Sequence, residues 1–230
     1  MSFAGLSKCE LPFFMEHVIG QIRNVTLKIA FGDMTKVKAD AYIVPQFNSC
    51  ASYGGVGGSV ARAGAVKGID EFAEFVSQKG EQKFGTTLLT KSHGGNSDKL
   101  LHVVSVGSSK EHEFDTVQSS IYNALTTAEQ NGVKSIASPA LGTGIIGNLT
   151  AEQSAKSTLS AIKQFADEGK NMDVSLVIYG NKSAYNDFVK TLSTKSYETA
   201  TKEGGEKQFD MGRWIVGMQR DADANKKSGI

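Results

Sequence analysis

The chain has 230 residues, 40% of them hydrophobic, and a formal net charge of +1. This length allows one sizeable core with tails, and the near-neutral charge argues against a nucleic-acid partner, because binding to phosphate backbones needs an excess of clustered Lys and Arg. The two cysteines, Cys9 and Cys50, lie far apart, so neither a disulfide framework nor a metal site is indicated, and a reducing, cytoplasmic compartment fits best.

Residues 1–24 are interpreted as an N-terminal extension. Their apolar stretch around Phe13 is interrupted by Pro12 and followed by Glu16, so we expect neither a signal peptide nor a membrane span, and no membrane partner. Alternating hydrophobic residues then predict a strand over 25–31 with one buried face.

A short second strand is expected after the first, and it is followed by a glycine-rich loop. The apolar run 41–44 forms this strand, which we expect to stop at Pro45. The loop 53–59 contains Gly54, Gly55, Gly57 and Gly58, and it leads into a helix of small residues that can pack closely on a sheet.

Strand and helix patterns alternate along the rest of the chain. Helical spacing predicts helices over 69–80, 117–128, 150–165 and 185–192, the third opened by a Thr150–Gln153 capping box. Further strands are expected at 86–90, 100–106, 134–140 and 174–179. This order predicts an α/β domain over 25–195 with three layers, α/β/α, around a mixed, mostly parallel six-stranded sheet.

Residues 196–230 are interpreted as a polar linker and C-terminal tail. The linker is rich in Ser, Thr, Lys, Glu and Gly. A hydrophobic cluster at 209–218 could pack back on the domain or recruit a partner.

The second glycine-rich loop, Gly142–Gly147, places three glycines in six residues between a strand and a helix. Glycine lets the backbone approach a ligand, and the unpaired N–H groups at the start of a helix favour an anion such as phosphate. A lone loop of this kind is as often only a tight connection. Two such loops, each after an apolar strand, suggest a diphosphate held from both sides at the carboxyl edge of the sheet.

Two other nucleotide-binding families fit this loop poorly. Gly142–Gly147 satisfies G-x-G-x-x-G, but it follows four strands, and the next acids, Asp167 and Glu168, fall near a helix end instead of a strand end. A P-loop is excluded because no Gly-Lys-Ser or Gly-Lys-Thr follows the glycines.

Four segments, in order, resemble the motifs of the macro domain family, which binds ADP-ribose. Gly32–Thr35 resembles the family's G-D-I-T, 39–44 resembles its V-D-A-I-V strand, and Asn48 with Gly54–Gly58 resembles N-A-A-N and the glycine loop that follows it. Gly142–Gly147 resembles the second loop, S-T-G-I-Y-G. The resemblance spans roughly residues 25–192.

The resemblance implies a role for each matching residue. Asp33, beside Met34, would accept a hydrogen bond from the adenine amino group, although Asp also commonly caps a turn. Tyr179 would stack on adenine or serve in ordinary packing. Asn48 would contact the distal ribose and is the candidate catalytic residue, or it only stabilises its loop. Backbone amides for the two phosphates would come from Gly55, Val56, Gly57, Gly58, Gly142, Thr143, Gly144, Ile145, Ile146 and Gly147. The resemblance implies no cofactor and no metal.

Three residues depart from the family pattern where its members do chemistry or hold the distal ribose. Pro45 replaces the first Asn of N-A-A-N, Gly57 stands where many hydrolytic members have Asp, and Ile146 stands where an aromatic residue commonly covers the ribose. A glycine cannot activate water through a side chain, so these departures point away from efficient catalysis. His102 resembles a structural histidine of the family.

Three functions are compatible with these patterns. The first is binding of ADP-ribose or a derivative, such as an ADP-ribosylated protein, with weak hydrolysis of ADP-ribosyl esters or ADP-ribose-1''-phosphate. The second is an interaction or regulatory domain with a vestigial nucleotide pocket. An NAD-dependent oxidoreductase ranks last.

Overall fold

The computed structural model describes residues 15–202. The chain divides into two units, residues 1–197 and 198–230, and every strand belongs to the first. The strands are β1 (Met15–Ile22), β2 (Val25–Phe31), β3 (Ala41–Phe47), β4 (Thr87–Lys91), β5 (Lys99–Val106), β6 (Ser135–Pro139) and β7 (Met172–Ile178). The helices are α1 (Gly55–Val60), α2 (Val66–Lys79), α3 (Glu113–Gln130), α4 (Ala151–Asp167) and α5 (Lys182–Lys202), with short turns η1 (Met34–Lys36) and η2 (Ala61–Ala65).

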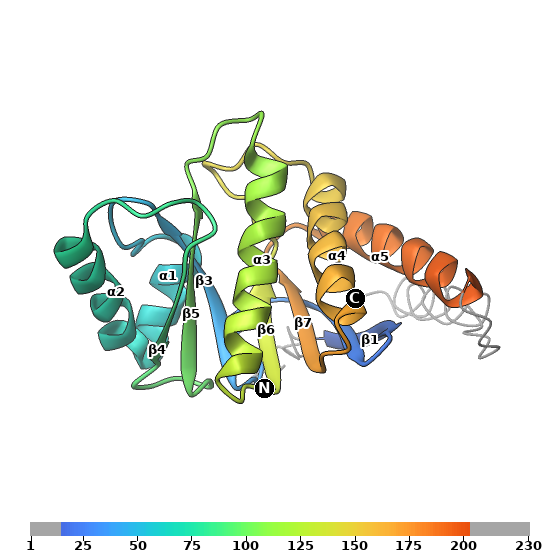
Figure 1. The fold of residues 1–230 in the computed structure, drawn as a ribbon, viewed down its shortest axis with the longest axis horizontal. Helices are drawn as coiled ribbons and strands as arrows, with labels where there is room; N and C mark the ends of the chain where they lie inside the picture. Colours follow the sequence, from blue (N-terminus) through green and yellow to red (C-terminus); the bar gives the residue numbers. More distant parts are fainter. Residues whose placement is uncertain (1–14, 203–230) are drawn as a thin grey trace, which may run out of the picture. The chain divides into compact units, whose positions relative to one another are not determined.

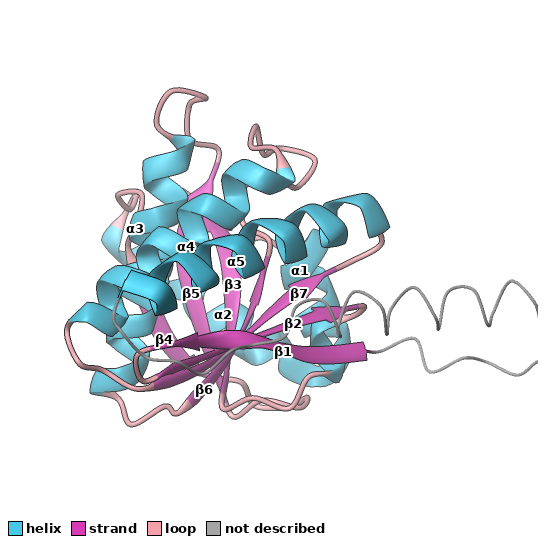
Figure 2. Cartoon of the chain, turned by 90° about the vertical axis from the view of Figure 1, so that its right-hand side faces the viewer, coloured by secondary structure: helices cyan, strands magenta, loops and turns pink. Residues whose placement is uncertain are grey.

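The strands form one sheet in the order β1-β2-β7-β6-β3-β5-β4. The outer pairs β1/β2 and β4/β5 are antiparallel, whereas the inner pairs are parallel. Figure 2 shows these strands fanning out with the usual sheet twist. The predicted α/β class and the mixed, mostly parallel sheet are confirmed.

The predicted count of six strands is too low, because β1 adds a seventh. This strand lies within the segment interpreted as an extension and pairs with β2. Its register shifts between Val18 and Gly20, and its buried hydrophobic residues, Ile19 and Ile22, are three positions apart. A bulge of this kind breaks the two-residue period by which a strand is recognised in sequence.

Helices cover both faces of the sheet, as Figure 1 shows, with α3, α4 and α5 on one face and α1 and α2 on the other. Alternate residues of β3 point to opposite faces of the sheet. Ala41 and Ile43 pack in the core under α3, α4 and α5, and Tyr42 and Val44 pack in the core under α1 and α2. This two-sided burial explains why the central strands are continuously apolar.

The strand β3 continues through Pro45 to Phe47, so the prediction that Pro45 ends it is wrong. The ladder between β3 and β6 covers only Ala41 and Tyr42, whereas β3 pairs with β5 as far as Phe47. Beyond Tyr42 one side of β3 is therefore without a strand partner in the described sheet. A residue that lacks an N–H is tolerated at such a position.

The start of β3 is fastened to the start of β6 by Asp40. Its carboxylate accepts hydrogen bonds from the N–H groups of Lys134 and Ser135, both at 2.9 Å. Partial burial acts to raise the pKa of Asp40, but these bonds outweigh it and hold the pKa below its usual value. The two strands are thus joined at this end and separate toward their carboxyl ends.

Two predicted features lie outside the described residues. These are Cys9 and the hydrophobic cluster at 209–218. Cys50 is a free, exposed thiol. No helix in the described range 15–202 is both long and apolar enough to cross a membrane.

Candidate functional site

The predicted site residues gather at one edge of the sheet. The strands β2, β7, β6 and β3 are successive parallel neighbours, so their carboxyl ends lie along the same edge. Asp33 follows β2, Tyr179 follows β7, the loop Gly142–Gly147 follows β6, and Asn48 follows β3. Figure 1 shows the loop after β6 above the sheet at this edge. The site residues therefore succeed one another across the sheet in the order Asp33, Tyr179, second glycine loop, Asn48.

The loop between β6 and α4 is held by its own backbone. The N–H of Gly147 donates to the carbonyl of Gly144 at 2.9 Å, and that of Leu149 donates to the carbonyl of Gly142 at 3.0 Å. A Cβ on Gly147 would lie 2.1 Å from the Gly142 oxygen, so only glycine allows this fold of the loop. The N–H groups of residues 143–146 have no hydrogen-bond partner among the described residues.

A buried carboxylate anchors the far end of the same loop. Glu113, at the start of α3, is 2% exposed, and its Oε2 accepts a hydrogen bond from the N–H of Asn148 at 2.7 Å. Sequence patterns gave no sign of this contact, because the two residues belong to different elements. The free amides of residues 143–146 thus lie in a loop that is held both by its own backbone hydrogen bonds and by Glu113.

The loop between β3 and α1 packs equally closely. A Cβ on Gly57 would lie 2.0 Å from the carbonyl oxygen of Ser52, and one on Gly58 would lie 2.5 Å from that of Tyr53. No side chain caps the first turn of α1, whose amides at Gly55, Val56 and Gly57 have no partner among the described residues. The N–H of Gly58 already donates to Gly54, as that of Gly147 does to Gly144, so these two amides are occupied.

Asp33 caps a turn with one oxygen of its carboxylate and leaves the other oxygen available. Its Oδ1 accepts a hydrogen bond from the N–H of Thr35 at 2.9 Å and so caps η1. Its Oδ2 has no partner among the side chains and backbone groups described. Met34 is 6% exposed and packs in the core, so it offers a ligand only its backbone. Tyr179 is 80% exposed, so its ring is available to a flat ligand.

Asn48 does not have a free amide group. Its Nδ2 donates to Oε1 of Glu81 at 2.5 Å, and its backbone carbonyl accepts from the N–H of Gln82 at 2.8 Å. Its Oδ1 is left to accept from a ligand hydroxyl. Glu81 therefore joins the candidate site through Asn48, and because the two residues lie 33 positions apart, no sequence pattern links them.

A buried polar chain supports the first loop from below. Oε1 of Gln46 accepts from the N–H of Ser52 at 2.5 Å, and Nε2 of Gln46 lies 2.9 Å from Nδ1 of His102. Nε2 of His102 lies 3.0 Å from Oγ1 of Thr90, and the His102 ring stacks on Phe72. Burial lowers the pKa of His102 to about 3, although the Gly68 carbonyl opposes this shift. The imidazole is therefore neutral, and its role is structural.

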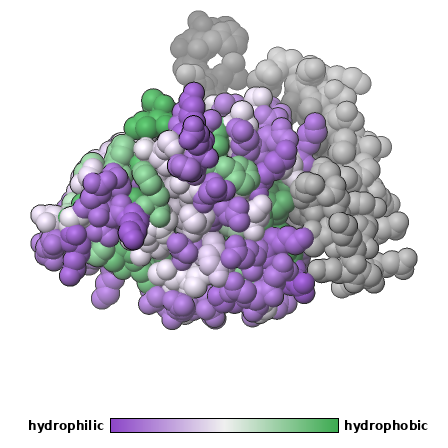
Figure 3. Space-filling view, turned by 45° about the horizontal axis from the view of Figure 1, so that its top comes forward, coloured by the Kyte–Doolittle hydropathy of each residue, from purple (hydrophilic) through white to green (hydrophobic). Residues whose placement is uncertain are grey.

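The exposed surface near this edge is mixed in character. Ile145 and Ile146 are exposed, and Figure 3 shows separate hydrophobic areas among hydrophilic ones on this side of the molecule. Apolar side chains beside free amides suit a ligand with both flat and charged parts.

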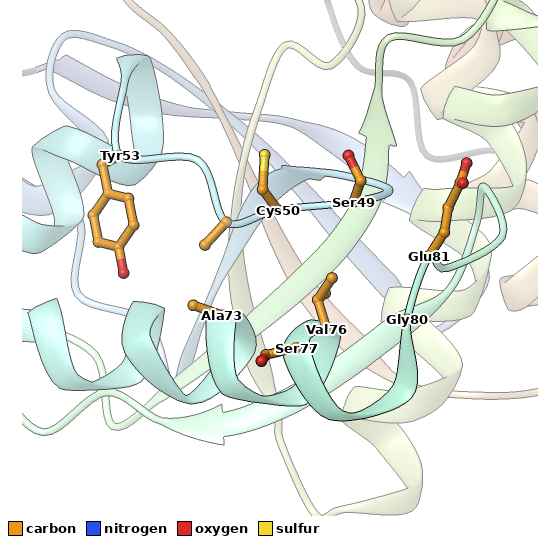
Figure 4. Close-up of a pocket in the computed structure, with 9 residues that line it drawn as sticks. Ser49, Cys50, Tyr53, Ala73, Val76, Ser77, Gly80 and Glu81 are labelled. Atoms are coloured by element: carbon orange, nitrogen blue, oxygen red, sulfur yellow. The ribbon is translucent and has the colours of Figure 1, made fainter.

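A pocket of about 330 Å³ lies between the first loop and α2 (Figure 4). We call it the α2 pocket, and it is lined by Ser49, Cys50, Ala51, Tyr53, Ala73, Val76, Ser77, Gly80 and Glu81. None of these residues comes from the second glycine loop, so the α2 pocket is not the predicted diphosphate site. Within residues 15–202 no cluster of His, Cys, Asp or Glu could hold a metal ion.

Comparison with known proteins identifies the class of protein. The family model described as the Macro domain matches residues 48–158. A protein of Pyrobaculum aerophilum is 31% identical over 182 residues, which are 77% of this chain and 95% of that protein. The O-acetyl-ADP-ribose deacetylase of Salmonella typhimurium is 30% identical over 141 residues, which are 60% of this chain and 78% of that protein.

A solved structure agrees in fold. The Oceanobacillus iheyensis macrodomain with ADP has a TM-score of 0.69 to this chain at 21% identity, over 80% of this chain and 97% of that one. The chain therefore belongs to the macro domain family.

Proposed function

We propose that the protein binds ADP-ribose or an ADP-ribose derivative along the carboxyl edge of its sheet. Asp33 and Tyr179 would hold adenine, the free amides of the two glycine loops would hold the diphosphate, and Asn48 would contact the distal ribose. The observation that carries this proposal is the order of these groups over four neighbouring strands, which is also the order of adenine, diphosphate and ribose in the ligand.

The comparisons support a nucleotide ligand. The Oceanobacillus iheyensis structure contains ADP, and the Salmonella relative is named for O-acetyl-ADP-ribose. We include ADP-ribosylated proteins among the derivatives, since they present the same nucleotide. The cytoplasmic location stays a prediction from the low cysteine count.

Calorimetry with ADP-ribose, AMP and NAD tests the adenine assignment through Asp33→Asn. Asn keeps an oxygen that can cap Thr35, but its amide group donates where the carboxylate accepts. Losing a charged hydrogen bond costs about 1.5 to 3 kcal/mol, so we expect the affinity for ADP-ribose to fall at least about tenfold. Unchanged affinity in a variant with unchanged melting temperature would contradict the assignment.

Ester hydrolysis is a second candidate function, favoured by the deacetylase relative. The reaction would consume water and release acetate from O-acetyl-ADP-ribose. The Ser52 carbonyl fills the space of a Cβ at Gly57, so the loop has no room for an acid at that position. We therefore expect turnover to be slow, to depend on Asn48, and to be abolished in Asn48→Ala. Turnover with O-acetyl-ADP-ribose, ADP-ribose-1''-phosphate and an ADP-ribosylated protein separates binding from hydrolysis.

A further inference from the structure

We propose that the α2 pocket is a second subsite, which takes a basic amino-acid side chain of a polypeptide that carries ADP-ribose. This proposal rests on the proposed function, because it needs the nucleotide to be seated with its distal ribose at Asn48. The pocket begins one residue further along the chain, at Ser49, and Asn48 Nδ2 donates to its rim residue Glu81. Asn48 therefore belongs to the boundary between the nucleotide site and the pocket.

The lining of the α2 pocket matches a long cationic side chain. Ala51, Ala73 and Val76 provide an apolar wall, and Ser49, Cys50 and Ser77 provide polar atoms around it. Glu81 is the one charged residue among those that line the pocket. Lys and Arg bury an aliphatic stem on apolar surface and place a charged head beside a carboxylate.

The carboxylate of Glu81 has capacity for this second partner. Its Oε1 accepts from Asn48, whereas its Oε2 has no partner among the side chains that the structure describes. Figure 4 shows Glu81 at one end of the pocket and Tyr53 at the other, with Val76 and Ser77 of α2 between them. A chain entering past Asn48 would meet the carboxylate first.

The size of the pocket argues for a substituent larger than an acetyl group. The volume of about 330 Å³ lies within the range of pockets that hold small ligands, about 300 to 1,000 Å³. An acetyl group has two carbons and one oxygen and would leave most of this space empty. An amino-acid side chain together with its backbone fills it better.

The walls of the α2 pocket are fixed without a ligand. The hydroxyl of Tyr53 donates to Asp70 on α2 at 2.6 Å, and the N–H of Gln82 donates to the carbonyl of Asn48 at 2.8 Å. The side chain of Gln46 also fixes the loop, because its Oε1 accepts a hydrogen bond from the N–H of Ser52. A preformed pocket costs a ligand less ordering free energy than one that must be assembled.

Two ADP-ribosylated peptides that differ at one residue test the proposal. One has Lys beside the modified residue and the other has Glu, and free ADP-ribose is the reference ligand. An exposed ion pair contributes up to about 1 kcal/mol, so we expect the wild type to bind the Lys peptide about fivefold more tightly than the Glu peptide. Added salt should reduce this ratio. In Glu81→Gln, which keeps an oxygen for Asn48, the ratio should fall to about one.

A space-filling variant gives a second readout. Ser77→Trp should weaken both peptides while the affinity for free ADP-ribose stays within about twofold, since Ser77 lies outside the nucleotide site. Gln78→Trp, an exposed neighbour on α2 that does not line the pocket, should change neither affinity. If free ADP-ribose fails to bind the wild type, the proposed function and this inference both fail. If it binds but the two peptides bind alike, or if Ser77→Trp folds and binds both peptides normally, the subsite alone is wrong.

Discussion

The buried imidazole of His102 has a defined tautomer. Because Gln46 Oε1 accepts from Ser52 N–H, the Gln46 amide nitrogen must face His102, and Nδ1 must accept from it. Nε2 then carries the proton and donates to Thr90, whose hydroxyl donates to the Gly68 carbonyl at 3.4 Å. The bond to Gln46 needs a neutral ring, because a protonated Nδ1 would carry a hydrogen and could not accept from the amide nitrogen.

This neutrality predicts a loss of stability in mild acid. Burial lowers the pKa of His102 to about 3, against about 6.5 in the unfolded chain, so between these values only the unfolded state takes up the proton. The stabilisation is complete above pH 6.5 and is lost as the pH falls, by about 1.4 kcal/mol per pH unit. Urea unfolding at pH 7.5, 6.0 and 5.0 measures this slope.

The variant His102→Gln isolates the contribution of the imidazole from that of other titrating groups. Gln retains a donor and an acceptor but does not titrate in this range. We expect it to be less stable than the wild type at pH 7.5 and to lose less stability between pH 7.5 and 5.0. Equal slopes in the two proteins would show that His102 is not the group responsible.

At the scale of elements, both glycine loops depend on close backbone contact. Gly147 and Gly57 each sit where a Cβ would lie about 2 Å from a carbonyl oxygen, whereas nothing lies within 4 Å of a Cβ on Gly144. Glycine therefore serves a different purpose at neighbouring positions of the same loop. At Gly147 it allows the loop to close, and at Gly144 it leaves room beside a free amide.

The pair Gly147→Ala and Gly144→Ala tests this difference. Gly147→Ala must push the Gly142 carbonyl away, so we expect it to lower the free energy of unfolding by about 1 to 3 kcal/mol and to weaken ADP-ribose at least about tenfold. Gly144→Ala should change stability by less than about 0.5 kcal/mol. Chemical unfolding measures the stability of both variants, and calorimetry measures their affinity for ADP-ribose. Equal losses of stability in the two variants would contradict the different roles assigned to Gly147 and Gly144.

At the scale of the whole molecule, the sequence predicts most of the features that depend on local patterns. Six strands, the Thr150–Gln153 capping box and the placement of both glycine loops at strand ends need only periodicity and turn chemistry, and the structure agrees with them. The bulged strand β1 and the passage of β3 through Pro45 could not be predicted, because each depends on which strand lies alongside.

Contacts between distant elements explain the remaining differences at the site. Glu81 and Asn48 lie 33 positions apart, and Glu113 and Asn148 lie 35 apart. The α2 pocket likewise exists only once α2 packs beside the loop after β3. Nothing in the sequence around a carboxylate indicates a partner that lies so far along the chain. Supporting residues such as Glu81 and Glu113 can therefore be identified only from the fold.

Linkage between binding and folding separates a working nucleotide site from a vestigial one. A ligand that binds only the native state at a hundred times its dissociation constant raises the free energy of unfolding by about 2.7 kcal/mol. We expect this gain for the full-length wild type with ADP-ribose, measured by urea unfolding followed by circular dichroism. In Asp33→Asn, with about tenfold weaker binding at the same ligand concentration, the gain should fall to about 1.4 kcal/mol.

AMP at that concentration should stabilise the wild type less than ADP-ribose, because it lacks the second phosphate and the distal ribose. No gain with millimolar ADP-ribose would favour a vestigial site, and equal gains in the wild type and the variant would place adenine away from Asp33.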